Sequence, residues 1–232
     1  MSFAARTAIV RLILVMLFLL APPWAPRARA QDDDAMMLVA NPALRDLDYR
    51  QTVLLAAPAP NGGHVGVILN RPTRRSLGSL FPEHEPSKKV IDPVYYGGPI
   101  SRGALVAVVK GDAPPGAPGT VQLMKSLYMA FRANLIDQVI ESRPNDARYY
   151  VGYVLWRPGE LRTEIDRGLW SVLSADPDIV FRKDTDSLWE EMLQQTRRIR
   201  AELDPRLRGD DEPYAAARLA AFDFSKVIAE PR

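Results

Sequence analysis

The sequence contains no cysteine and only two histidines, His64 and His84. Without cysteine the chain has no disulfides, no thiolate metal ligands and no thiol nucleophile. A metal site needs several ligands brought together, and neither histidine has further ligands at a spacing that indicates one. His84 lies between Glu83 and Glu85 and is interpreted as part of a solvated, charged loop over residues 83–89. We therefore expect no metal and no other cofactor.

Signatures of catalysis are also missing from the sequence. It contains no nucleophile elbow, phosphate-binding loop, dinucleotide fingerprint or zinc-protease motif. The pattern around Ser79 and Ser101 indicates no general base. Glu160 and Glu164 are one helical turn apart and could face one cleft, but exposure to solvent is the common state of such a pair. No residue is therefore predicted to be catalytic.

A surplus of basic residues is missing from most of the chain. The 232 residues carry a formal net charge of +2, but residues 1–30 contain four arginines and no acid, so residues 31–232 carry 2 − 4 = −2. Binding to nucleic acid requires a concentrated basic face. We therefore expect no nucleic-acid partner.

The N-terminus combines basic residues with a short apolar run. Arg6 and Arg11 precede the apolar residues 12–21, a run about half as long as the roughly twenty residues that span a bilayer. Within residues 28–30 (Ala-Arg-Ala), Ala28 and Ala30 then place small side chains at the −3 and −1 positions before Gln31. This order is typical of a secretory signal peptide.

We expect residues 1–30 to be cleaved and the mature chain to be periplasmic or secreted, with no stable membrane insertion after cleavage. Two alternatives remain open. In the first, the apolar run is retained as an uncleaved anchor. In the second, translation begins at Met36 or Met37 and the protein is cytoplasmic.

The rest of the chain is predicted to hold one domain. Residues 31–36 form a short acidic spacer, and residues 37–203 are long enough to bury a core without covalent cross-links. Residues 204–232 have mixed charge and few large apolar side chains, and they are interpreted as a flexible C-terminal tail.

A hairpin is the clearest local structure. Residues 61–63 (Asn-Gly-Gly) accept the positive φ angles of a tight turn. Apolar strands are predicted on either side, over residues 51–57 and 65–69. The second strand is expected to deliver Asn70 and Arg71 to an edge of the sheet.

Other elements follow from periodicity and from turn residues. Apolar residues at helical spacing predict one helix from Leu123 to Ile140, which ends before Pro144. Because strands and helices mix without strict alternation, and hairpins pair antiparallel, the pattern favours a single α+β domain. The remaining predictions are strands at 37–40, 90–96, 104–109, 148–155 and 169–173, a helical turn at 76–81, a short helix between Pro158 and Gly168, a turn capped by Asp176, and a last helix opened by a capping box at Ser187 and Glu190.

Four motifs in order resemble those of the AlgH/YqgE family. They are LVANP at residues 38–42, GHVGVILNRP at 63–72, YGGP at 96–99 and GYVLWRPGEL at 152–161. The resemblance covers residues 37–181. It implies a single domain with a strongly curved, mostly antiparallel sheet flanked by helices.

The family is uncharacterised, and its members are often labelled putative transcriptional regulators. This sequence shows neither a helix-turn-helix pattern nor a basic face. Family members usually begin near Met36 and have no leader. The family pattern places a small residue at the position of His64, so the resemblance gives that histidine no catalytic role.

The motifs suggest a ligand-binding junction made of Asn70, Arg71, Tyr96, Gly97 and Gly98, called the junction below. Glycines let backbone N–H groups approach a ligand closely, and an arginine pairs a carboxylate or phosphate bidentately. The alternative is structural. Arg71, reaching back towards the glycine turn, and Asn70 would then satisfy backbone carbonyls at strand ends. We favour the structural role for Arg71.

Tyr153, Trp156 and Trp170 form an aromatic group in the sequence pattern. Core packing is expected, and a surface groove for a protein partner is the alternative. Two functions stay open at this point. One is a non-catalytic binding or regulatory module with an unknown protein partner. The other is a small-anion-binding protein or a hydrolase that uses the junction.

Overall fold

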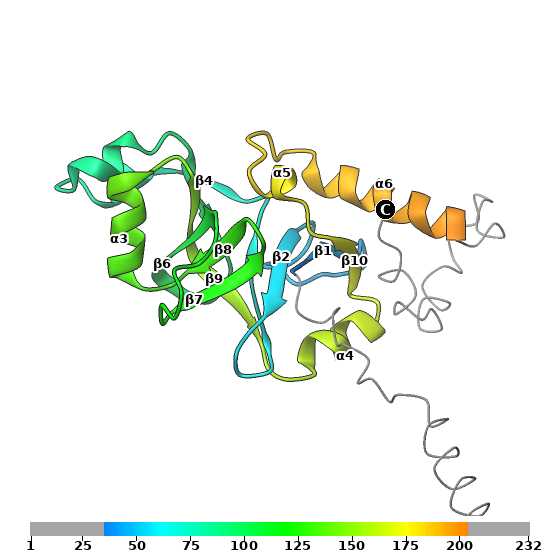
Figure 1. Cartoon of the computed structure of the whole chain (residues 1–232). Coiled ribbons are helices and arrows are strands. Elements are labelled where there is room, and N and C mark those ends of the chain that lie inside the picture. The colour runs from blue at the N-terminus through cyan, green and yellow to red at the C-terminus, as the bar shows by residue number, and fades with distance from the viewer. Residues whose placement is uncertain (1–34, 204–232) are drawn as a thin grey trace, which may run out of the picture. The chain divides into compact units, whose positions relative to one another are not determined.

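The computed structural model describes residues 35–203 (Figure 1). The predicted leader, most of the predicted spacer and the predicted tail lie outside these residues. The strands are β1 (Met36–Ala40), β2 (Val53–Pro58), β3 (His64–Ile68), β4 (Pro72–Ser76), β5 (Pro93–Tyr96), β6 (Ile100–Lys110), β7 (Thr120–Met124), β8 (Leu127–Ala130), β9 (Ala147–Trp156) and β10 (Trp170–Ser174). The helices are α2 (Leu77–Leu80), the 3-10 helix η1 (Glu85–Lys89), α3 (Ala133–Ser142), α4 (Glu160–Asp166), α5 (Pro177–Val180) and α6 (Leu188–Leu203).

The strands form one curled sheet in the order β10-β1-β2-β3-β9-β6-β8-β7, and every neighbouring pair in this order is antiparallel. β5 adds to β9 in parallel, and β4 pairs with β5. The backbone N–H of Ala35, just ahead of β1, donates to the carbonyl of Leu123 in β7 over 3.0 Å. The sheet therefore curls so far that β7, the last strand in this order, is hydrogen-bonded to the residue just ahead of β1. The predicted α+β fold with a curved, mostly antiparallel sheet is confirmed.

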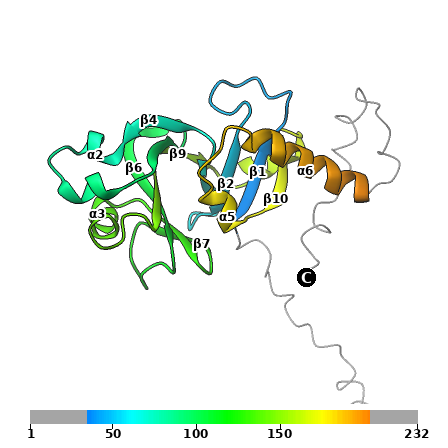
Figure 2. The same cartoon turned by 90° about the horizontal axis from the view of Figure 1, so that it is seen from above.

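Helices cover both faces of β1, β2 and β10, which explains why β1 and β2 are apolar almost throughout. Along β1, Met37 and Val39 pack in the cluster that holds Leu188 and Met192 of α6. Leu38, between them, packs on the opposite face with Leu161 of α4. Figure 2 shows α6 crossing β1, β2 and β10.

The prediction of one helix over residues 123–140 is wrong. The first half forms the hairpin β7–β8, which turns at Lys125 and Ser126, and only the second half forms α3. All four residues of β8 are buried because its side chains pack alternately into two apolar clusters, Leu127 and Met129 in one and Tyr128 and Ala130 in the other. Such a strand is apolar at every position and therefore also matches helical spacing.

Two smaller expectations also need correction. Residues 83–89 were expected to form a loop, but Glu85–Lys89 is a 3-10 helix with a proline in its first turn. The last helix begins at Leu188, directly after Ser187, and the Ser187 hydroxyl donates to Glu191, over 2.5 Å, which is one residue beyond the Glu190 of the predicted capping box. Within residues 35–203, no helix is both long enough and apolar enough to cross a membrane.

Candidate functional site

Asn70 follows β3, and its side chain is hydrogen-bonded to the backbone just ahead of β2 and at its first residue. Its Oδ1 accepts from the backbone N–H of Val53 over 3.0 Å, and its Nδ2 donates to the carbonyl of Gln51 over 2.9 Å. Since β3 lies between β2 and β9, Asn70 stands at the end of an interior strand. The expectation that it lies at a sheet edge is wrong, and the reason is that β9 pairs with the outer side of the hairpin.

Arg71 is bound to the loop of residues 46–51, which is called loop 46–51 below. Its two terminal nitrogens each donate to the carbonyl of Leu47 over 3.2 Å, and Nη2 also donates to the carbonyl of Arg50 over 3.1 Å. The guanidinium therefore holds carbonyl groups, as the structural interpretation expects. These carbonyls belong to loop 46–51 and not to the glycine turn towards which Arg71 was expected to reach.

Tyr96 and Arg102 hold the same loop through Asp48. The Tyr96 hydroxyl donates to Asp48 Oδ1 over 2.8 Å, and Arg102 Nη2 lies 3.2 Å from Asp48 Oδ2. Burial raises the pKa of the Tyr96 hydroxyl, and its hydrogen bond to Asp48 raises that pKa further. Inside the loop, Asp46 Oδ1 accepts from the backbone N–H groups of Asp48 and Tyr49. Loop 46–51 is thus fixed from within and by four neighbouring side chains, namely Asn70, Arg71, Tyr96 and Arg102.

Gly97 and Gly98 have no side chain, so their backbone can pass very close to the backbone of β9. A Cβ atom on Gly97 would lie 2.2 Å from the carbonyl oxygen of Gly152, and one on Gly98 would lie 2.5 Å from that of Tyr153. The Gly97 N–H donates to Val151, and the Gly97 carbonyl accepts from Ile68. The glycines therefore contact neighbouring backbone, and both backbone groups of Gly97 are engaged.

The structure brings Trp156 and Trp170 together but separates them from Tyr153. The two indoles are 3% and 4% exposed, and both N–H groups donate to Oε2 of Glu164, over 2.9 and 2.8 Å. Tyr153 packs edge-on against Phe131, at 5.5 Å between ring centroids, in a different apolar cluster.

Glu160 and Glu164 have separate structural roles. Glu160 accepts from the backbone N–H of Arg157 over 2.8 Å, whereas Glu164 is partly buried and receives the two indoles. Treating the two as one solvated pair is therefore wrong. The two tryptophans in the sequence could have indicated this role for Glu164, because the N–H group of a buried tryptophan usually has a hydrogen-bond acceptor.

Sequence reasoning also missed Arg148, the largest fully buried side chain among the described residues. Its terminal nitrogens donate to the carbonyls of Val180 and Arg182 over 2.8 and 2.9 Å, and its guanidinium lies 4.4 Å from the centroid of the Tyr95 ring. A lone arginine within the apolar run of β9 was the available signal, because a fully buried arginine needs partners. Within residues 35–203, no three His, Asp or Glu side chains gather so that they could hold a metal ion.

The described residues form a single-domain α+β protein with a curled sheet, in which the motifs that hold Arg71 and Gly97 meet where β3 ends: the Tyr96 N–H donates to the Arg71 carbonyl, and the Ile68 N–H donates to the Gly97 carbonyl. A model of the AlgH-like family matches residues 37–199. The chain belongs to the AlgH-like family.

Relatives and solved structures agree with this assignment. A UPF0301 protein of Mycobacterium tuberculosis H37Rv is 31% identical over 176 residues, which cover 75% of this chain and 85% of the relative. A UPF0301 protein of Thermobifida fusca is 32% identical over 168 residues, covering 68% and 84%. The crystal structure of protein DIP2367 from Corynebacterium diphtheriae has a TM-score of 0.58 at 22% identity, covering 85% of this chain and 96% of that one.

The solution structure of the AlgH protein from Pseudomonas aeruginosa has a TM-score of 0.54 at 21% identity, covering 85% and 93%. At these identities the two structures support the fold alone.

Proposed function

We propose that the protein is a non-catalytic binding module that presents loop 46–51 to a protein partner. One observation carries the proposal: Asn70, Arg71 and Tyr96, which belong to the signature motifs, direct their polar groups at this loop. A regulatory role would then be exerted through the partner.

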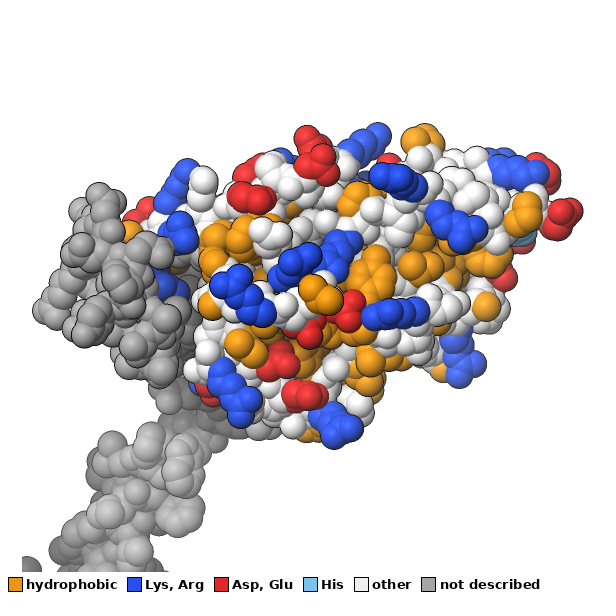
Figure 3. All heavy atoms as spheres, turned by 180° about the vertical axis from the view of Figure 1, so that it is seen from behind, with side chains coloured by type: hydrophobic (Ala, Val, Ile, Leu, Met, Phe, Trp, Pro, Cys, Tyr) orange, Lys and Arg blue, Asp and Glu red, His pale blue; other side chains and the backbone are white. Residues whose placement is uncertain are grey.

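The loop combines a fixed backbone with an exposed apolar side chain. Leu47 is 73% exposed, and Arg45 and Arg50 near it are exposed as well. The face seen from behind in Figure 3 carries exposed apolar side chains among basic and acidic ones. A loop that is ordered before binding loses less conformational entropy on association. An exposed leucine in a charged rim is therefore suited to dock into a partner's apolar pocket.

The second function, a small-anion-binding protein or hydrolase at the junction, has less support. The terminal nitrogens of Arg71 and the amide of Asn70 already donate to backbone carbonyls. An anion at the junction would have to displace these bonds. Each hydrogen bond of this kind contributes about 1 kcal/mol to stability, so displacement would weaken such binding.

Site-specific cross-linking tests the proposal. A photo-reactive amino acid replaces Arg45, which is exposed beside the loop, in the chain expressed in its native cells. We expect a covalent protein adduct that is lost when Leu47→Asp is added. Ile91→Asp is the matched control, since Ile91 is 76% exposed and lies elsewhere, and it should leave the adduct intact. No adduct, or an adduct that survives Leu47→Asp, contradicts the proposal.

A further inference from the structure

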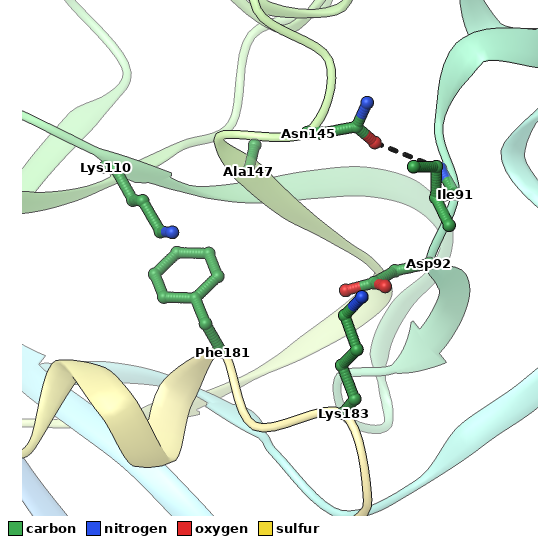
Figure 4. Close-up of a pocket in the computed structure, with 7 residues that line it drawn as sticks. All are labelled: Ile91, Asp92, Lys110, Asn145, Ala147, Phe181 and Lys183. Carbon is green, nitrogen blue, oxygen red and sulfur yellow. Dashed lines mark hydrogen bonds between the residues drawn. The ribbon is translucent and has the colours of Figure 1, made fainter.

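A pocket of about 130 Å³ lies where residues 91–92 ahead of β5, the end of β6, the start of β9 and the chain after α5 meet (Figure 4). Its apolar lining consists of Ile91, Ala147 and Phe181. Its charged lining consists of Asp92, Lys110 and Lys183. None of these residues belongs to the junction or to loop 46–51.

The one carboxylate of the pocket is already paired with a buried cation. Asp92 Oδ2 lies 3.4 Å from Nη2 of Arg148, whose side chain has no exposed surface. Neither Lys110 nor Lys183 belongs to the ion pairs found within residues 35–203. With Arg148 included, three cations and one carboxylate give 3 − 1 = +2 around the pocket. A concave site with this balance attracts anions.

The cations stand beside apolar surface. Lys110 Nζ lies 4.7 Å from the centroid of the Phe181 ring, and Figure 4 shows Lys110 beside that ring and Lys183 farther along the pocket, next to Asp92. Asn145 also lines the pocket, and its side-chain amide is held in place by two hydrogen bonds. It accepts from the Ile91 N–H over 3.1 Å and donates to the Lys89 carbonyl over 3.2 Å. The pocket thus offers positive charge and an aromatic face to the same small molecule.

We propose that this pocket binds a small organic anion, with a carboxylate or phosphate group held by Lys110 and Lys183 and an apolar part against Phe181. The pocket is smaller than the roughly 300–1,000 Å³ typical of sites for drug-sized ligands. The ligand class is therefore limited to molecules about the size of benzoate or a short phosphate ester. The proposal does not depend on the proposed function, because it concerns a different part of the surface.

Calorimetric titration of the full-length chain tests it, with benzoate, inorganic phosphate and neutral benzamide as probes. We expect benzoate or phosphate to bind and benzamide not to bind. The double variant Lys110→Gln/Lys183→Gln should weaken binding by about tenfold or more. Lys125→Gln, which removes an exposed lysine from the β7–β8 turn, is the matched control and should change nothing.

The two probes separate the possible head groups. Stronger binding of benzoate assigns a carboxylate ligand, and stronger binding of phosphate assigns a phosphate ester. Phe181→Ala should weaken benzoate and leave phosphate unchanged, since only benzoate has an apolar part. The proposal is overturned if neither anion binds at concentrations on the order of 10 mM, or if binding survives in the double variant.

Discussion

Gly152 shows how closely backbone segments meet at the junction. Its φ is +72°, and a Cβ atom there would lie 2.3 Å from the carbonyl oxygen of Gly98. Gly98 and Gly97 face β9 at similarly short range. The glycines of the YGGP and GYVLW motifs are therefore explained by this crossing. The crossing in turn places Tyr96 beside loop 46–51.

Alanine at Gly152 should be much more costly than alanine at Gly168. Gly168 has the same φ of +72°, but a Cβ atom there would have no neighbouring atom within 4 Å. Gly168→Ala should therefore lower the free energy of unfolding only by the conformational cost, about 1 kcal/mol. Gly152→Ala adds a clash with backbone and should cost about 2–5 kcal/mol. Urea unfolding of both variants measures the difference, and equal costs would contradict the close crossing.

The motifs identified the positions of Asn70, Arg71 and Tyr96 but not their partners. Arg71 bonds to carbonyls 21 and 24 residues upstream, and Tyr96 to a carboxylate 48 residues upstream. A local pattern shows where a strand ends, but it cannot show which distant carbonyl is left unpaired there. For the same reason Arg148, whose carbonyl partners are 32 and 34 residues downstream, was not recognised.

Elements with local signals were predicted well, and those that depend on distant pairing were not. The hairpin β2–β3, the apolar core of β6, and α4 between Pro158 and Gly168 follow from turn residues and apolar runs. β4 was missed because its side chains are mostly exposed and it is defined by pairing with β5. The β7–β8 hairpin was missed because a fully buried strand lacks the alternation that distinguishes it from a helix.

The first turn of α6 is linked to the preceding loop by an ion pair that should depend on pH. Both terminal nitrogens of Arg182 donate to Glu191, over 2.5 and 2.8 Å. The hydrogen bonds from Arg182, and then the one from Ser187, lower the pKa of Glu191 to about 2. The Arg182 carbonyl is also an acceptor for Arg148, so this pair supports the loop that lines the pocket.

Glu191→Gln should lower the melting temperature in a pH-dependent way. The folded pKa lies below the unfolded value of about 4.3, so the pair's contribution is complete above that value and is lost as the pH falls towards about 2. The melting temperatures of wild type and variant should therefore differ near neutral pH and converge in acid. Glu190→Gln, which removes the neighbouring carboxylate, should show no such convergence. A Glu191→Gln difference that is constant with pH would contradict this role.

The described domain as a whole fixes its loops with single side chains that reach from the sheet or a helix to backbone groups. Arg71 holds loop 46–51, Arg148 holds the chain after α5, and Asn145 holds the chain ahead of β5. Trp189 of α6 likewise donates to the carbonyl of Ala40. A curled sheet with loops fixed in this way is suited to present surface to other molecules.

Export is the prediction that concerns the chain beyond this domain. The basic start, the short apolar run and the Ala-Arg-Ala sequence at residues 28–30 predict a mature protein that starts near Gln31 outside the cytoplasm. Cell fractionation followed by N-terminal sequencing measures both properties. A cytosolic product that starts at Met36 or Met37 would contradict export.

The most direct test of the account is hydrogen–deuterium exchange of loop 46–51 in Arg71→Ala. The Arg50 N–H donates to the carbonyl of Asp46 over 2.8 Å, and Arg71 holds the carbonyls of Leu47 and Arg50. If the signature arginine exists to fix this loop, amides of residues 49–50 should exchange about tenfold faster or more in Arg71→Ala. Amides of β2 should stay protected. Arg74→Ala, which removes an exposed arginine from β4, should match wild type. Unchanged exchange across residues 46–51 in Arg71→Ala would contradict the claim that the motif holds the loop.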